Sequence, residues 1–151
     1  MGRLNLKTKI LITGAAGYVG KNTVFILKKN ENFQLTLIDN KNKPKLNFLK
    51  KLNYIKHDLS INLKKKLIEI NPDIIIHLAA LTSVTESEKF KKKYYKVNFL
   101  VTKNICNYCK QFNKKLIFAS SAGVYKSKDI SIKEDDIKKP KNFYGKTKLL
   151  S

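Results

Sequence analysis

The segment GAAGYVG at positions 14–20 contains three glycines at regular intervals. An apolar run typical of a buried strand precedes it, and a helical period of apolar residues follows, which is the context of a phosphate-binding loop. There, Gly14 permits a tight turn, Gly17 lets the backbone approach a diphosphate, and Gly20 lets the helix pack closely on the strand. A diphosphate is favoured at a helix N-terminus. The pattern therefore predicts a dinucleotide site.

An ATP-type loop is a poorer match, because Ala15 and Asn22 stand where that motif needs Gly and Ser or Thr. Asp39 follows the second predicted strand, where a carboxylate accepts hydrogen bonds from the ribose hydroxyls of a dinucleotide and repels a 2′-phosphate. We therefore expect NAD rather than NADP, the alternative for Asp39 being a turn cap. Asp58 follows the third predicted strand and either accepts from the adenine amino group or caps a turn.

Three further side chains have the types needed for proton transfer at an alcohol. Ser121 lies at the end of the fifth predicted strand, whereas Tyr144 and Lys148 are four residues apart on one face of a predicted helix. A phenol with the ordinary pKa of about 10 is a poor base at neutral pH. A lysine ammonium one turn away favours the phenolate, and a serine hydroxyl can orient the reacting alcohol. The Tyr–Lys spacing is weak evidence in a Lys-rich chain and becomes informative only beside a dinucleotide fold.

Strand and helix patterns alternate along the chain, which predicts an α/β fold with a doubly wound parallel sheet. The polar candidates all fall where strands end, and carboxyl ends of parallel strands share one edge, where ligands bind. Expected strands cover residues 9–13, 33–38, 52–56, 73–80 and 115–120; expected helices cover 18–29, 63–70, 86–112 with a possible break, and a segment starting near 142.

The formal net charge is +21, and all but Arg3 of the 32 basic residues are lysines. Nucleic-acid sites usually use Arg for bidentate contacts, so we expect a solvated Lys-rich surface and no nucleic-acid partner. No apolar run reaches about 18 residues, so we expect no membrane span.

Cys106 and Cys109 have a C-x-x-C spacing within a predicted helix. Zinc would need two further ligands, and His57 and His77 lie far away without paired spacing. We therefore expect structural cysteines, no metal site and a reducing cytoplasmic location.

An ordered set of motifs resembles the extended short-chain dehydrogenase/reductases, and more narrowly the NAD-dependent nucleotide-sugar epimerases and dehydratases. The resemblance covers nearly the whole chain and rests on TGAAGYVG at 13–20, Asp58-Leu59, HLAA at 77–80, Asn98, SSAGVY at 120–125 and the Tyr144/Lys148 pair. It implies a Rossmann fold with NAD, and a nucleotide sugar as substrate.

The resemblance also implies residue roles. Ser121, Tyr144 and Lys148 would be catalytic, with Tyr144 as general base and Lys148 also holding the nicotinamide ribose. Ala79 and Ala80 would lie against the cofactor, and Asn98 would support the site geometry. The expected cofactor-binding set is Gly14, Gly17, Tyr18, Val19, Gly20, Asp39, Asn40, Asp58, Leu59, Ala79, Ala80, Asn98, Tyr144 and Lys148.

Within this family the subfamily signals differ. Dehydratases carry an Asp-Glu pair where this chain has Ala122-Gly123, which disfavours elimination of water. The segments at 38–40, 84–87 and 94–95 are similar to UDP-glucose/galactose 4-epimerases, although Thr82 stands where those enzymes have a lysine. Epimerisation at C4 through a keto intermediate is therefore expected. The alternatives are a nucleotide-sugar reductase or dehydratase and a non-catalytic NAD(H)-binding fragment.

The chain ends at Ser151, three residues past Lys148. The resemblance implies a C-terminal substrate lobe, so we expect residues 1–151 to be an incomplete Rossmann domain, inactive alone. Enzymes of this family pair through the long helix and the helix of the catalytic tyrosine. A homodimer is therefore expected of the full-length form and is doubtful for this chain.

Overall fold

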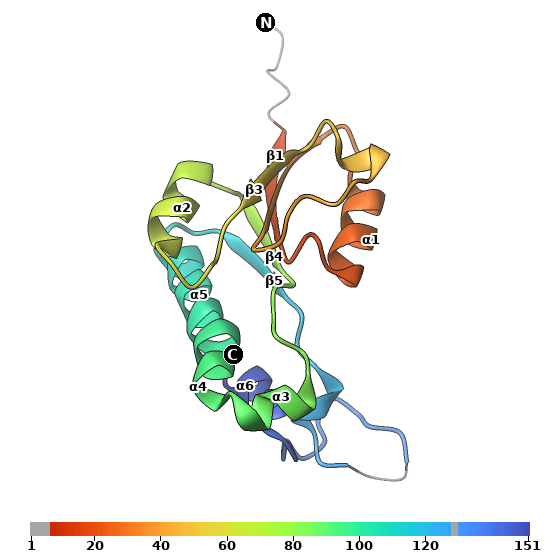
Figure 1. Ribbon diagram of the computed structural model, residues 1–151, viewed down its shortest axis with the longest axis vertical. Helices are drawn as coiled ribbons and strands as arrows, with labels where there is room; N and C mark the ends of the chain where they lie inside the picture. Colours follow the sequence, from red (N-terminus) through yellow and green to blue (C-terminus); the bar gives the residue numbers. More distant parts are fainter. Residues whose placement is uncertain (1–6, 128–129) are drawn as a thin grey trace, which may run out of the picture.

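The computed structural model describes residues 7–127 and 130–151, and its centre is a five-stranded parallel sheet with the order β3-β2-β1-β4-β5 (Figure 1). The predicted doubly wound α/β class is confirmed. The strands are β1 (Thr8–Thr13), β2 (Phe33–Asp39), β3 (Asn53–Lys56), β4 (Ile74–His77) and β5 (Lys115–Phe118).

Helices connect the strands and cover both faces of the sheet. The α-helices are α1 (Tyr18–Leu27), α2 (Leu63–Ile70), α3 (Val84–Lys89), α4 (Lys91–Tyr94), α5 (Val101–Gln111) and α6 (Phe143–Leu150); η1 (Asn47–Leu49) and η3 (Ala122–Val124) are 3₁₀ turns, and η2 (Tyr95–Leu100) is a π-helix. In the part of the chain that the structure describes, no helix is long and apolar enough to cross a membrane.

Alternation along the strands divides the apolar side chains between two faces. Ile10, Ile12 and Leu37 belong to the cluster that α1 covers, whereas Leu11 and Ile75 belong to the cluster under α2 and α5. Figure 1 shows α1 on one side of the sheet and α2 with α5 on the other. The fold is therefore a three-layer sandwich around two cores.

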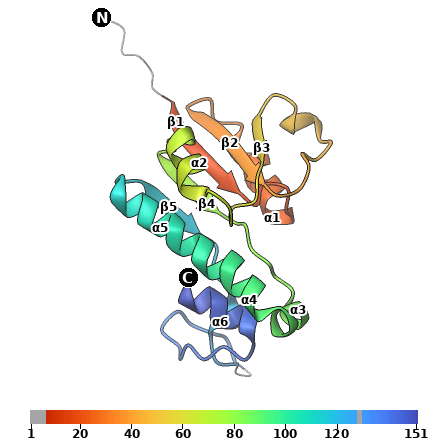
Figure 2. The ribbon, with the colours of Figure 1, turned by 60° about the vertical axis from the view of Figure 1, so that its left-hand side comes forward.

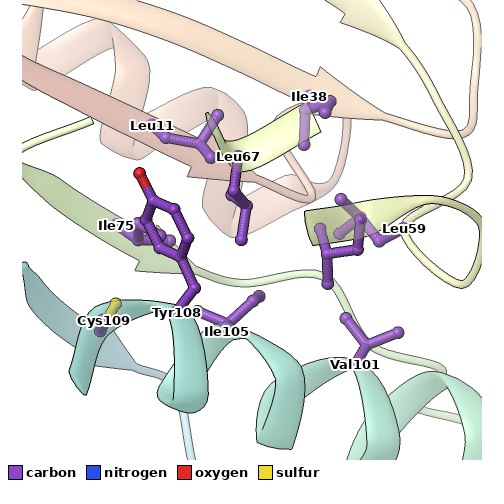
Figure 3. Packing of buried hydrophobic residues seen from close by; sticks show 10 residues of the cluster. Leu11, Ile38, Leu59, Leu67, Ile75, Val101, Ile105, Tyr108 and Cys109 are labelled. Atoms are coloured by element: carbon purple, nitrogen blue, oxygen red, sulfur yellow. The ribbon is translucent and has the colours of Figure 1, made fainter. Parts of the chain in front are cut away.

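The core under α5 fixes the long helix against the sheet. Figure 3 shows Leu11 and Ile75 of the sheet facing Ile105 and Tyr108 of α5, with Leu67 of α2 between the layers. All five side chains are at most 4% exposed. This packing holds α5, and with it the segment leading into α5, at a defined distance from β4.

The helix expected over residues 86–112 is interrupted. It begins at Val84, because Ser83 caps it by accepting a hydrogen bond from the amide of Glu86 at 3.2 Å. Phe90 leaves the helical region at φ −117° and ψ 48°, which separates α3 from α4. The chain then passes through the π-helix η2 before α5. The α3, α4 and α6 helices lie together beyond the carboxyl ends of the strands (Figure 2).

Strand β4, expected over residues 73–80, ends at His77, and β5 and α1 also end earlier than expected. The fifth strand ends at Phe118, so Ser121 lies in the loop beyond it rather than at its end. The last helix begins as predicted, because the Asn142 side chain caps it by accepting from the Gly145 amide at 2.8 Å. Helix α1 ends at Leu27 rather than at residue 29.

Ile105→Ala should lower the free energy of unfolding by about 2–5 kcal/mol, because it leaves a cavity under α5. Ile68→Ala, on a helix position that is 50% exposed, should cost less than about 1 kcal/mol. Urea unfolding of both variants measures this. Equal losses would show that the α5 core does not stabilise the fold as described.

Candidate cofactor and catalytic site

The glycine loop has no room for side chains where it meets the sheet. Gly14 has a φ of +69°, and a Cβ there would lie 2.7 Å from the Ala79 backbone nitrogen. A Cβ on Gly20 would collide with the Gly14 carbonyl oxygen and lie 2.8 Å from Ala15 Cα. These contacts let α1 start directly against β1 and β4.

The loop is open at Gly17, unlike at Gly14 and Gly20. A Cβ there would approach only the Gly14 carbonyl oxygen, at 3.1 Å. Gly17 is also the N-cap of α1, and no side chain in residues 7–127 and 130–151 caps this helix. The amides of its first turn are therefore available to an anion, and a dinucleotide diphosphate fits this cradle.

Asp39 is tied to the glycine loop. Its Oδ2 accepts from the Ala16 amide at 2.9 Å, and its Oδ1 accepts from the Lys41 amide at 3.0 Å. The residue is 8% exposed. A carboxylate has about four acceptor positions, so two stay available for ribose hydroxyls. Asp39 thus both holds the loop and can act as the predicted ribose acceptor.

A cavity of about 370 Å³ lies in front of the glycine loop. Its lining brings together most of the predicted cofactor-binding residues. These are Gly14, Gly17, Asp39, Asn40, Asp58, Leu59, Ala79 and Ala80, joined by His57, Ser60, Leu81, Thr82, Ser83, Glu86, Tyr94, Val97 and others. Within the described residues, Tyr18, Val19, Gly20 and Asn98 lie outside this lining; Tyr18 and Val19 are 83% and 59% exposed on the first turn of α1.

Asp58 makes the turn-capping bond that was one of its two expected roles. Its Oδ1 accepts from the Ser60 amide at 2.8 Å, and this bond is the main reason that its pKa is lowered. The nearby charges of Lys96 and His57 lower the pKa further. The carboxylate therefore lines the cavity in its charged form, and the adenine contact stays a prediction.

His77 joins three elements behind the cavity. Its Nδ1 lies 2.7 Å from Thr13 Oγ1, and its Nε2 lies 3.1 Å from Thr102 Oγ1. Thr13 Oγ1 already accepts from the amides of Leu78 and Ala79, so its single proton goes to Nδ1. His77 Nε2 then donates to Thr102, whose hydroxyl donates to the Asn98 carbonyl.

This arrangement requires a neutral imidazole. Burial, together with the Lys148 charge, lowers the pKa of His77 to about 3. The chain of hydrogen bonds fixes the backbone of Leu78 and Ala79, where the loop expected to touch the cofactor begins. His77 therefore acts as a structural link between β1, β4 and α5.

Asn98 fixes the other end of that loop. It is 1% exposed; its Oδ1 accepts from the Leu81 amide at 2.9 Å, and its Nδ2 donates to the Leu81 carbonyl at 3.0 Å and to Thr147 Oγ1 at 3.1 Å. The π-helix η2 carries this residue, and π-helical turns frequently occur at functional sites. Asn98 thus connects the loop after β4 with α6.

Lys148 is almost fully enclosed, with 6% of its surface exposed. Its Nζ lies 4.1 Å from the centre of the Phe118 ring, a cation–π arrangement. Burial lowers the pKa of Lys148 to about 8, so it still carries a proton at neutral pH. Phe118 in turn stacks on His77, with ring centres 5.9 Å apart. Lys148 is therefore linked through Phe118 and His77 to Thr13, the residue that precedes the glycine loop.

Tyr144 is positioned from α3, an element that sequence reasoning did not connect with it. Ser87, which is fully buried, accepts from the Tyr144 amide at 3.0 Å and donates to the Val84 carbonyl at 2.6 Å. Glu88 accepts from the Phe143 amide at 2.6 Å. These side chains satisfy amides of the first turn of α6 and fix the helix that presents Tyr144 and Lys148.

The close packing of Gly145 against η3 brings Ser121, the third catalytic candidate, to the same helix. A Cβ on Gly145 would collide with the Gly123 carbonyl oxygen and lie 2.9 Å from Pro140 Cβ, so η3 packs directly on α6. Ser121 caps η3 by accepting from the Gly123 amide at 3.1 Å. Ser121 therefore lies beside the first turn of α6. Among the described residues, Ser121, Tyr144 and Lys148 are outside the lining of the cavity.

In residues 7–127 and 130–151 no group of three His, Cys, Asp or Glu side chains is placed to hold a metal ion. Cys106 and Cys109 lie within α5 as free thiols, and burial raises the pKa of Cys109.

The profile of the NAD dependent epimerase/dehydratase family matches residues 10–151. The chain belongs to this family. This match confirms the family resemblance and the Rossmann-type fold expected from the sequence. The UDP-glucose 4-epimerase of Mycoplasma genitalium is 35% identical over 162 residues, which cover 97% of this chain and 47% of that protein.

Solved structures of family members have the same architecture. The UDP-Glc/GlcNAc 4-epimerase of Campylobacter jejuni superposes with a TM-score of 0.85 at 31% identity, covering 95% of this chain and 46% of its own. The UDP-glucose 4-epimerase of Brucella ovis, solved in complex with NAD, gives 0.81 at 26% identity, covering 95% and 45%. The chain therefore spans about half the length of these epimerases.

Acid should destabilise the protein through His77. The folded state binds the second imidazole proton of His77 less tightly than the unfolded state. The contribution of neutral His77 to the free energy of unfolding is therefore complete above pH 6.5 and is lost as the pH falls towards 3. The stability advantage of the wild type over His77→Gln should therefore shrink from pH 7 to pH 4, by at most about 1.4 kcal/mol per pH unit. Urea unfolding at each pH measures it, with His57→Gln as control. A difference that stays constant with pH would contradict the neutral-imidazole assignment.

Proposed function

We propose that this chain carries the NAD site and the catalytic residues of a nucleotide-sugar epimerase, and that the reaction is epimerisation at C4 of a UDP-hexose through a keto intermediate. One observation carries this: Lys148 is connected through Phe118 and His77 to Thr13, the residue before the open glycine cradle, and Tyr144 lies on the same helix as Lys148. The 4-epimerases similar to this chain support the choice of reaction.

Gly17 and the first turn of α1 would hold the cofactor diphosphate, Asp39 a ribose, and Ala79 and Ala80 the adjoining wall. When bound, NAD supplies a reversible hydride acceptor for a carbinol carbon. The negative charge of Asp39 disfavours a 2′-phosphate, which selects NAD over NADP.

Tyr144 acts as the general base and accepts the proton of the reacting sugar hydroxyl. The protonated Lys148, one helical turn away, favours the phenolate by its charge, and its burial strengthens this effect because less water screens the pair. The Ser121 hydroxyl orients the reacting alcohol from η3. Phe118 keeps the ammonium on its ring face and thereby limits where Nζ can lie.

A second candidate function is NAD(H) binding without turnover. The cavity lining favours it, because among the described residues it contains the glycine loop and Asp39 but not Ser121, Tyr144 or Lys148. For the complete protein we also propose a homodimer and a cytoplasmic location.

Tyr144→Phe should lower turnover of UDP-glucose by about 10²–10⁴-fold while leaving the Kd for NAD within about twofold, because only proton transfer is removed. Coupled assay of UDP-galactose formation and calorimetric titration of NAD measure the two effects. Tyr125→Phe is the control, since its hydroxyl donates to the Glu134 carbonyl outside the catalytic set.

Equal loss of turnover and of NAD affinity would mean that Tyr144 is a structural residue. Tight NAD binding by the wild type without any turnover would instead support the second candidate.

A further inference from the structure

Tyr94, the last residue of α4, has a buried hydroxyl that forms no hydrogen bond. The residue is 1% exposed. Among the described residues, its OH is the one buried side-chain polar atom without a hydrogen-bond partner. An unsatisfied buried hydroxyl typically costs about 1–3 kcal/mol, whereas a phenylalanine would fill the same space without that cost. A bound ligand that forms a hydrogen bond with this hydroxyl would explain why a tyrosine stands here.

The position of Tyr94 indicates where such a partner lies. Tyr94 lines the same cavity as the glycine loop, together with Ser83 and Glu86 of the α3 start. Both residues face the phenol without reaching hydrogen-bond geometry. Burial raises the pKa of Tyr94 most, the Glu86 charge raises it further, and the polar groups of Ser83 lower it. The three side chains therefore lie at one part of the cavity wall, whereas Asp39 lies at the end of β2.

The chemistry of these groups selects the ligand. A Glu86 carboxylate repels a phosphate and accepts hydrogen bonds from neutral hydroxyls. A phenol donates one proton and has none to spare for a second acceptor. A sugar hydroxyl matches both, because it can accept from Tyr94 and donate to Glu86 at the same time.

We propose that Tyr94, Glu86 and Ser83 form a subsite for a sugar hydroxyl in the cofactor cavity. Tyr94 OH donates to the ligand oxygen, and the same ligand hydroxyl donates to the Glu86 carboxylate. The hydroxyl belongs either to a ribose of NAD or to the hexose of a nucleotide sugar, which share this chemistry. The inference rests on the proposed function, since it requires that the cavity binds these molecules.

Tyr94→Phe should have opposite effects on stability and on binding. The free protein should unfold at a higher temperature, because the unpaired hydroxyl is gone. The Kd should rise about three- to tenfold, through loss of one hydrogen bond. Titration with NAD alone tests the ribose, and titration with UDP-glucose in the presence of saturating NAD tests the hexose. Glu86→Gln should weaken the same ligand, and the double variant should lose less than the product of the two effects.

Tyr108→Phe is the matched control, since Tyr108 is 4% exposed in the α5 core and does not line this cavity. It should leave both Kd values unchanged. A Tyr94→Phe variant that binds NAD and UDP-glucose as tightly as the wild type overturns the subsite and leaves the proposed function standing. A wild-type chain that binds neither molecule overturns both.

Discussion

A neutral, buried histidine is the interaction on which the site depends. His77 connects Thr13 at the end of β1 with Thr102 on α5, and Thr13 in turn fixes the amides that begin the loop after β4. An edge of parallel strands would otherwise expose unpaired backbone groups where a ligand must fit. The hydrogen-bond chain satisfies these groups internally and leaves the outer side of the loop free.

The same imidazole also connects the two functional halves of the edge. The Phe118 ring stacks on His77, and the Lys148 ammonium lies over the Phe118 ring. Burial and the charge of Lys148 keep His77 neutral, and burial of Lys148 itself lowers its pKa to about 8. The glycine loop and α6 are therefore coupled electrostatically as well as by packing, with Asn98 as a second bridge through Thr147.

Local signals in the sequence were sufficient for the parts of the site that depend on local geometry. The glycine loop, the apolar strands and the start of the last helix near residue 142 could be predicted because each depends on neighbouring residues. The contacts of Ser87 with Tyr144 and of Phe118 with Lys148 join residues that are 57 and 30 positions apart, so no local sequence pattern predicts them. The π-helix at Asn98 was missed for a similar reason, since tertiary hydrogen bonds stabilise it.

The net charge of +21 makes one measurement especially decisive for the central claim, that the glycine cradle and Asp39 form an NAD site. A Lys-rich surface attracts any polyanion and would bind the more highly charged NADP better than NAD. A specific site with a carboxylate at the ribose has the opposite preference. Calorimetric titration of the chain with each dinucleotide at physiological salt separates the two. The account predicts that NAD binds at least about tenfold more tightly, a difference of about 1.4 kcal/mol. Equal or tighter binding of NADP, or binding of neither, would contradict it.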